Sequence, residues 1–421
     1  MIDRSQQPQI VVPSSVKVIP YDDLKSPLGV PIYRLDNSGY DVVRISLVFR
    51  AGVTQQSQPF LSSSVINNIT EGTKKHTASE IADFIDYYGI IYDISVDMDY
   101  SIITICTLKH FFDKALELLE DILNPTFPEY EIKIYAAKKK QLIAMQRAKI
   151  AYVAQEHLQN TFFGDDNAYG KIFDTSEYDN LNSDLLNAFF KKHYTRDNMF
   201  VVVSGDSTKD DITKIGGIVD ALPRGTRNSA FTPKALPVND FYLEKEGSMQ
   251  SAIKIGRVLF NKQHPDFIGM QIVAKILGGY FGSRLIMSLR EDKGYTYGIF
   301  SNMVNTDTTG YFIIAGEVIA KHTDDAIKAV FAEIAKLQDD LIGDKELSMV
   351  KSVMIGEVMR ILDGPFGVAD VLIENIQNEQ DDTNINDVIE EIKNISAERV
   401  RDLARKYLQH KDLSTIVVGK K

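Results

Sequence analysis

Hydrophobic and polar positions follow the same order twice along the chain. In the first half, a helical pattern over residues 185–194 leads into an apolar strand and a glycine at 200–205. In the second half, a helical pattern over residues 400–407 leads into a strand and a glycine at 416–419. Tyr194 and Tyr407, which end the two helical patterns, lie 213 positions apart. Self-similarity over such a long period predicts two copies of one structural unit.

Two further landmarks repeat in the same order. Ala115 and Ala326 lie in similar helical patterns and are 211 positions apart. The tripeptide Tyr-Gly-Ile occurs at 88–90 and again at 297–299, an offset of 209, each time after a predicted helix. Because the three offsets agree within four residues, we interpret the chain as a duplication.

Each half alternates strands with amphipathic helices, but the strands between residues 90 and 108 follow one another without a helix. This mixture predicts an α+β fold of two duplicated modules, each a mostly antiparallel sheet with helices packed on one face. The turn-rich, basic segment 222–237 reads as a linker, which divides the chain into residues 1–228 and 229–421. Thr77 and Glu80 have the spacing of a capping box at a helix start.

Composition limits the possible partners and sites. The formal net charge of −11 disfavours binding to nucleic acid or to anionic membranes, and neither is expected as a partner. Met1–Pro13 lacks the apolar core of an export signal, so we expect a cytoplasmic protein, or a periplasmic one if a signal has been removed. The single cysteine, Cys106, excludes an intrachain disulfide and a cysteine-cage metal site.

The residues alone show no complete catalytic constellation. No two of the seven histidines have the spacing that presents both to a metal from one helix face. The segment Gly-Gly-Tyr-Phe-Gly at 278–282 lacks the lysine of a phosphate loop and predicts a tight turn before a helix at 283–292. Arg290 and Tyr297 flank Gly294, which is expected to end that helix, so the chain reversal can bring two hydrogen-bond donors together. A cation at a helix end and a tyrosine in a strand also have ordinary structural explanations.

The region around this pair carries a resemblance. Leu-Gly-Gly at 277–279, Ser-Arg-Leu at 283–285 and Leu-Arg-Glu-Asp-Lys-Gly-Tyr-Thr-Tyr at 289–297 resemble the second-module arginine/tyrosine motif of the pitrilysin/insulinase-type metallopeptidases, which include the mitochondrial-processing-peptidase-like proteins. Segments 29–33, 50–53, 72–75, 167–170 and 198–206 follow the family's order. The resemblance covers essentially the whole chain.

Active members of this family carry an inverted zinc motif, H-x-x-E-H, just before the Gly-Thr found here at 72–73. By that alignment, Ser63 and Asn67 stand at the two histidine positions and Ile66 at the glutamate position. Ala144 stands where the family's third ligand is expected. Zinc hydrolysis needs about three nitrogen or oxygen ligands and a base. The resemblance therefore implies a degenerate site without zinc in this chain.

By resemblance, the chain is the non-zinc subunit of a heterodimeric zinc metallopeptidase that degrades or processes unfolded peptides. Arg290 and Tyr297 would act in trans on the substrate carbonyl and oxyanion, and a homologous partner subunit would hold the zinc. The peptide would lie extended along a sheet edge of that partner. Two alternatives remain open: a non-enzymatic peptide-binding or structural core subunit, and a homodimer with a relocated metal site. The chain in isolation could also form a homodimer.

Overall fold

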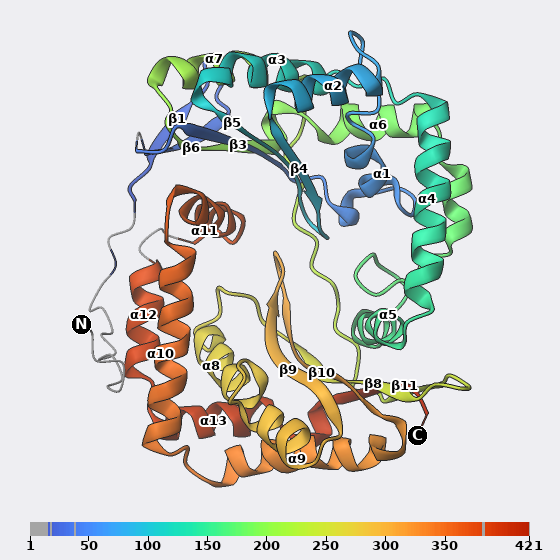
Figure 1. Ribbon diagram of the computed structural model, residues 1–421, viewed down its shortest axis with the longest axis vertical. Coiled ribbons are helices and arrows are strands. Elements are labelled where there is room, and N and C mark those ends of the chain that lie inside the picture. Colours follow the sequence, from blue (N-terminus) through green and yellow to red (C-terminus); the bar gives the residue numbers. More distant parts are fainter. Residues whose placement is uncertain (1–15, 17–18, 38, 381–383, 421) are drawn as a thin grey trace, which may run out of the picture.

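The computed structural model describes residue 16 and residues 19–37, 39–380 and 384–420. These residues form two α+β modules that face each other (Figure 1), which confirms the predicted fold class. The expectation about Met1–Pro13 lies outside the described residues. Within those residues, no helix is both long enough and apolar enough to cross a membrane.

The first module is built on one sheet with the strand order β1-β2-β6-β3-β5-β4. Neighbouring strands are antiparallel except for the parallel pair β2 and β6. Its elements are β1 (Asp22–Lys25), β2 (Pro31–Asp36), β3 (Val42–Phe49), η1 (Val53–Gln55), α1 (Leu61–Asn67), α2 (Ala78–Tyr88), β4 (Ile91–Val96), β5 (Ser101–Leu108), η2 (Lys109–Phe111), α3 (Phe112–Ile122), α4 (Glu129–Arg147), α5 (Ile150–Phe163), η3 (Thr175–Asn180), α6 (Ser183–His193), η4 (Arg196–Asn198), β6 (Met199–Gly205) and α7 (Lys209–Asp220).

The second module repeats this plan with the strand order β7-β11-β8-β10-β9. Only its outer pair, β7 and β11, is parallel among the described strands. Its elements are β7 (Phe241–Glu244), β8 (Gln250–Leu259), α8 (Phe267–Gly278), the π-helix η5 (Ile286–Asp292), β9 (Thr296–Asn305), β10 (Gly310–Ile319), η6 (Ala320–His322), α9 (Thr323–Asp339), α10 (Asp344–Ile361), α11 (Pro365–Gln377), α12 (Asn384–Asn394), α13 (Ala397–Tyr407), η7 (His410–Asp412) and β11 (Ser414–Gly419).

The two sheets correspond strand by strand, because β2-β6-β3-β5-β4 and β7-β11-β8-β10-β9 carry their single parallel pair at the same place. Residues 223–240 contain neither helix nor strand and connect the modules. The division between residues 228 and 229 stays a prediction.

One of the repeat landmarks was wrong. Ala115 and Ala326 do lie at matching places in α3 and α9, both fully buried. Gly89, however, ends α2 with a left-handed φ of 60°, whereas Gly298 lies inside β9. The glycine that ends the corresponding helix is Gly294, with a φ of 63°. The shared tripeptide therefore pairs Gly89 with Gly298, whereas the structural equivalent of Gly89 is Gly294. A helix end selects glycine for its left-handed conformation, which a match of three residue types does not detect.

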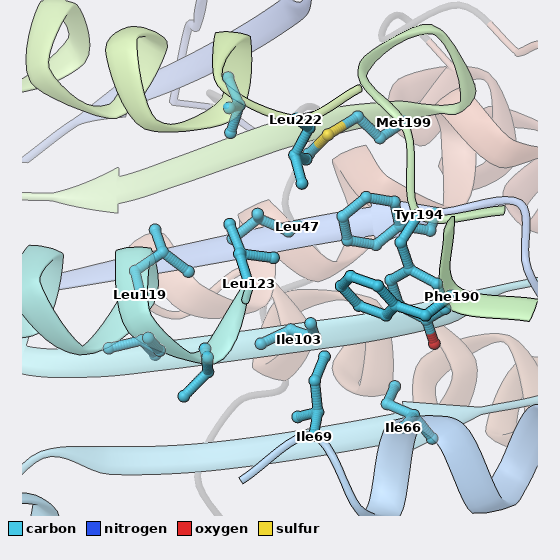
Figure 2. Close-up of a cluster of buried hydrophobic side chains, with 14 of the residues drawn as sticks. Leu47, Ile66, Ile69, Ile103, Leu119, Leu123, Phe190, Tyr194, Met199 and Leu222 are labelled. Atoms are coloured by element: carbon cyan, nitrogen blue, oxygen red, sulfur yellow. The ribbon is translucent and has the colours of Figure 1, made fainter. Parts of the chain in front are cut away.

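The first-module core lies between its sheet and its helices (Figure 2). Leu47 and Ile103 extend from the sheet, and Leu119 of α3 meets them from the helical layer. The ring of Phe190 stacks on that of Tyr194, with centroids 4.7 Å apart. These side chains are almost fully withdrawn from water, so the hydrophobic effect holds sheet and helices together.

Each module also covers the other module's sheet. Helix α5 of the first module packs on β8 and β11, and helix α11 of the second packs on β2 and β6 (Figure 1). Leu158 of α5 is fully buried in the first of these contacts, and Leu372 of α11 lies against Val202 in the second. The prediction that helices pack on only one face of each sheet is therefore incomplete. On the opposite face of each sheet, one helix from the other module covers part of the surface.

The capping box at the start of α2 is present as predicted. The Thr77 hydroxyl accepts a hydrogen bond from the Glu80 N–H, and the Glu80 carboxylate accepts one from the Thr77 N–H at 2.8 Å. We expect Thr77→Ala to lower the free energy of unfolding by about 1 kcal/mol. Without the hydroxyl, the Glu80 N–H loses its hydrogen-bond acceptor and the capping box is broken. Denaturant unfolding measures this, with Thr77→Ser as the control that keeps the hydroxyl. Equal stability of the alanine variant would contradict it.

Candidate functional site

Helix α1 carries three of the four positions at which the resemblance places zinc-site residues. Ile66 is 1% exposed and points into the first-module core (Figure 2). The Ser63 hydroxyl donates to the carbonyl of Phe60 at 3.0 Å, and the Asn67 amide donates to the carbonyl of Ser63 at 2.8 Å. Both polar side chains are therefore engaged with the backbone of their own helix, and the third is part of a packed core.

The fourth position, Ala144, lies on an exposed stretch of α4. The α4 side chain that reaches α1 is Tyr135, whose hydroxyl donates to the carbonyl of Ser63 at 3.3 Å. Burial raises the pKa of the Tyr135 phenol to about 12, so it stays protonated as a donor. The ring of Phe60, just before α1, stacks on Tyr178 with centroids 4.0 Å apart. Hydrogen bonds and aromatic contacts, not charged ligands, join these elements.

These residues do not fit a zinc ion. Ala144 and Ile66 have hydrocarbon side chains, and Ser63 and Asn67 have a neutral hydroxyl and a neutral amide. None of the four supplies an anionic or imidazole ligand. In the part of the chain that the structure describes, no group of three or more histidine, cysteine, aspartate or glutamate residues is arranged to hold a metal. Sequence reasoning passed over Glu71, next to Gly72, whose pKa is raised by burial and by the charge of Glu131 on α4.

Arg290 lies on η5 and Tyr297 near the start of β9. The sequence predicts an ordinary helix over 283–292; the structure has a π-helix over Ile286–Asp292, and Gly294 follows its end in the left-handed conformation, as predicted. The N–H of Tyr295 donates to the carbonyl of Leu289 at 2.8 Å, which closes the reversal into the strand. A π-turn adds a residue to the helical repeat, occurs often at functional sites, and changes the direction of the side chains that follow.

The strand that carries Tyr297 is irregular at that point. Its pairing with β10 shifts between Gly316 and Val318, so Tyr297 and Gly298 both stand opposite Glu317. The Thr296 hydroxyl accepts from the Gly298 N–H at 3.0 Å and donates to the Glu317 carbonyl. Tyr297 is 90% exposed. A bulge of this kind re-aims a side chain, and the side chain at this bulge, Tyr297, is in solvent.

The Arg290 guanidinium lies 4.9 Å from the centre of the Phe281 ring and pairs with the Glu291 carboxylate at 3.4 Å. Its side chain is 38% exposed. Another motif residue, Arg284, is occupied instead by a two-point ion pair with Glu346 of α10, at 2.8 and 2.9 Å. Arg284 therefore anchors the start of the helix, while the Arg290 side chain remains partly exposed beside Glu291 and Phe281, and Tyr297 is in solvent.

Comparisons with known proteins support the family resemblance. Residues 180–354 match the family model described as the peptidase M16 inactive domain. The chain is 25% identical to the uncharacterized zinc protease YmxG of Bacillus subtilis over 80% of its own length and 82% of the relative's. It is 23% identical to the non-peptidase homolog YmxG of Helicobacter pylori over 64% of each chain.

Solved structures share the fold. A peptidase M16 inactive domain from Pseudomonas fluorescens superposes with a TM-score of 0.89 at 20% identity, covering 95% of this chain and 98% of that one. A protease from Helicobacter pylori superposes with a TM-score of 0.83 at 16% identity, covering 95% and 100%. Together with the motif at 277–297, these matches support the resemblance to the M16 (pitrilysin/insulinase-type) peptidases, among which the matching family model is described as an inactive domain.

Proposed function

We propose that this chain is the zinc-free subunit of a heterodimeric zinc metallopeptidase that degrades or processes unfolded peptides. It contributes Arg290 and Tyr297 to the active site of a homologous subunit that holds the zinc. The peptide binds extended along a sheet edge of that partner, where main-chain hydrogen bonds add it as a further strand.

The observation that carries the proposal is the contrast between the two halves of the ancestral site. Ile66 is built into the core and Ser63 and Asn67 bond to their own helix, whereas Arg290 on η5 is partly exposed and Tyr297 near the start of β9 is 90% exposed. A scaffold has no need for an exposed guanidinium and phenol in that arrangement.

In the proposed role, the two donors act on the oxygen of the scissile carbonyl. The guanidinium supplies a charge and a fork of N–H groups, and the phenol supplies one O–H. Donors aimed at an oxygen that becomes negative stabilise the transition state more than the ground state. The partner's zinc polarises the same carbonyl. Nothing in this role requires a metal ligand from this chain.

A second candidate is a non-enzymatic peptide-binding or structural core subunit of the same fold. The names of two relatives favour it: a non-peptidase homolog of Helicobacter pylori and a probable inactive metalloprotease of Bacillus subtilis, the latter 19% identical over 68% of this chain. The third alternative, a homodimer with a relocated metal site, lacks a ligand cluster among the described residues.

Reconstitution tests the proposal. The purified chain is expected to hold no stoichiometric zinc and to leave an unfolded peptide intact, and a mixture with a zinc-bearing homologue encoded beside it is expected to cleave that peptide. Metal analysis and a fluorogenic peptide assay measure the two results, with the zinc-bearing subunit alone as control. Full activity of that subunit alone, or a peptide bound but never cleaved by any mixture, would favour the second candidate.

A further inference from the structure

Two hairpin turns, one from each module, meet between the sheets. The turn 97–100 joins β4 to β5, and the turn 306–309 joins β9 to β10; Figure 1 shows the two hairpins reaching toward each other. The N–H of Asp307 donates to the Asp99 carboxylate at 3.3 Å across the junction. Residues more than 200 positions apart therefore form a direct contact between the modules.

This junction buries charged groups. Arg50, at the end of β3, forms an ion pair with Asp307, and both side chains are below 10% exposed. A second Arg50 nitrogen donates to the Tyr100 hydroxyl at 2.6 Å, and its guanidinium lies 4.9 Å from the centre of the Tyr100 ring. The Tyr100 hydroxyl donates in turn to Asp307 at 3.3 Å and also lies 3.4 Å from the carbonyl of Gln377, at the end of α11.

Asp99 is the member of this cluster without a cation of its own. It is 5% exposed, and its Oδ2 accepts a hydrogen bond from the Tyr169 hydroxyl at 2.8 Å. Its Oδ1 is buried and has no hydrogen-bond partner in the described part of the chain. Two buried carboxylates, Asp99 and Asp307, thus lie at one junction, where Arg50 pairs with Asp307 and the exposed Asp97 is close by.

Each turn is held in place by hydrogen bonds to the rest of its own module. The N–H groups of Gly52 and Val53 donate to the carbonyls of Asp99 and Asp97 at 3.1 and 3.0 Å. The side-chain amide of Asn261 donates to the carbonyl of Asp307 at 2.9 Å. Because each turn is bonded to its own module, repulsion between the two carboxylates acts on the contact between the modules.

We propose that the junction of turns 97–100 and 306–309 is a proton-sensitive latch, which holds the two modules together more tightly at mildly acidic pH than at neutral pH. The proton enters at Asp99, whose unpartnered Oδ1 becomes a donor. Its uptake removes the repulsion with Asp307 and leaves Arg50 matched to a single buried carboxylate. Loss of the proton restores two buried negative charges and loosens the contact.

Electrostatics supports this reading. Burial raises the pKa of Asp99 to about 6; the charges of Asp307 and Asp97 act in the same direction, and the Tyr169 hydroxyl opposes them. A carboxyl whose pKa is higher in the closed state than in the open state stabilises the closed state when it is protonated. This stabilisation is complete below the ordinary pKa of the carboxyl and is lost as the pH rises through about 6. If opening returns Asp99 to an ordinary pKa near 4, the opening equilibrium grows about tenfold between pH 5 and pH 7.5.

Hydrogen exchange of the backbone amides in the turn 306–309 tests the latch, after correction for the intrinsic effect of pH on exchange. The wild-type chain is expected to open about tenfold more at pH 7.5 than at pH 5. Asp99→Asn keeps an oxygen that accepts a hydrogen bond from Tyr169 but cannot ionise. Its opening equilibrium is expected to differ less than twofold between pH 5 and pH 7.5, and at both pH values to equal that of the wild type at pH 5. Asp93→Asn, an exposed charge on β4, is the matched control and should behave like the wild type.

A wild-type profile that is flat between pH 5 and 7.5, or a tenfold change that persists in Asp99→Asn, would overturn the latch. Tyr169→Phe gives a second reading that does not depend on the folding of the asparagine variant. In the wild type, the Tyr169 hydroxyl stabilises the ionised Asp99 carboxylate. Without this hydroxyl, the pKa of Asp99 rises, so the midpoint of the opening transition in Tyr169→Phe should lie at higher pH than in the wild type. A midpoint that stays in place would also count against the proposal.

Discussion

Arg290→Ala is expected to lower the turnover of the reconstituted peptidase by about 10²- to 10³-fold, which is the usual cost of losing one oxyanion donor. The effect should fall on kcat more than on KM, because the donor acts on charge that develops in the transition state. Zinc content of the heterodimer should not change, since no metal ligand is touched. Steady-state kinetics with a fluorogenic peptide, together with metal analysis, measures both quantities.

Tyr297→Phe removes only the phenolic O–H and is expected to lower kcat in the same direction. Tyr87→Phe is the matched control, because Tyr87 is another strongly exposed phenol, 81% exposed, on α2 of the first module. Arg290→Lys keeps the charge but not the fork of donors, so partial activity is expected from it. If both Arg290→Ala and Tyr297→Phe left kcat unchanged while the mixture remained active, these residues would have no catalytic role.

Much of the fold follows from local patterns in the sequence. The capping box at Thr77 depends on residues three apart, and the strands of 90–108 on alternation within a few residues. The duplication was visible because whole helix-to-strand units repeat. The exchange of α5 and α11 was not, since both helices have apolar residues that fit any sheet and sequence carries no signal for which sheet they cover.

The candidate site divides in the same way. A motif located Arg290 and Tyr297, and Gly294 marked the helix end between them. The π-turn and the bulge opposite Glu317 were missed, although Gly298 next to Tyr297 is a typical signal for a bulge. The junction of Arg50, Asp99 and Asp307 could not be predicted, because its members come together only when two modules are placed against each other.

The packing of α1 leads to the second large expected effect. Ile66→Glu restores the family's base at its own position, and it is expected to lower the free energy of unfolding by about 4 kcal/mol. Ile66 is 1% exposed among the core residues of Figure 2, so the change both loses apolar burial and places a carboxyl among hydrocarbon side chains.

The loss should grow with pH. A buried carboxyl has a raised pKa, so the unfolded chain releases its proton first and stability falls by up to about 1.4 kcal/mol per pH unit until the folded carboxyl also ionises. Denaturant unfolding at pH 5 and pH 8 measures this. Ile66→Leu, which conserves volume, should stay within about 1.5 kcal/mol of the wild type. If Ile66→Glu were instead as stable as the wild type at both pH values, position 66 would accept a charge, and α1 would still have the environment of a catalytic helix.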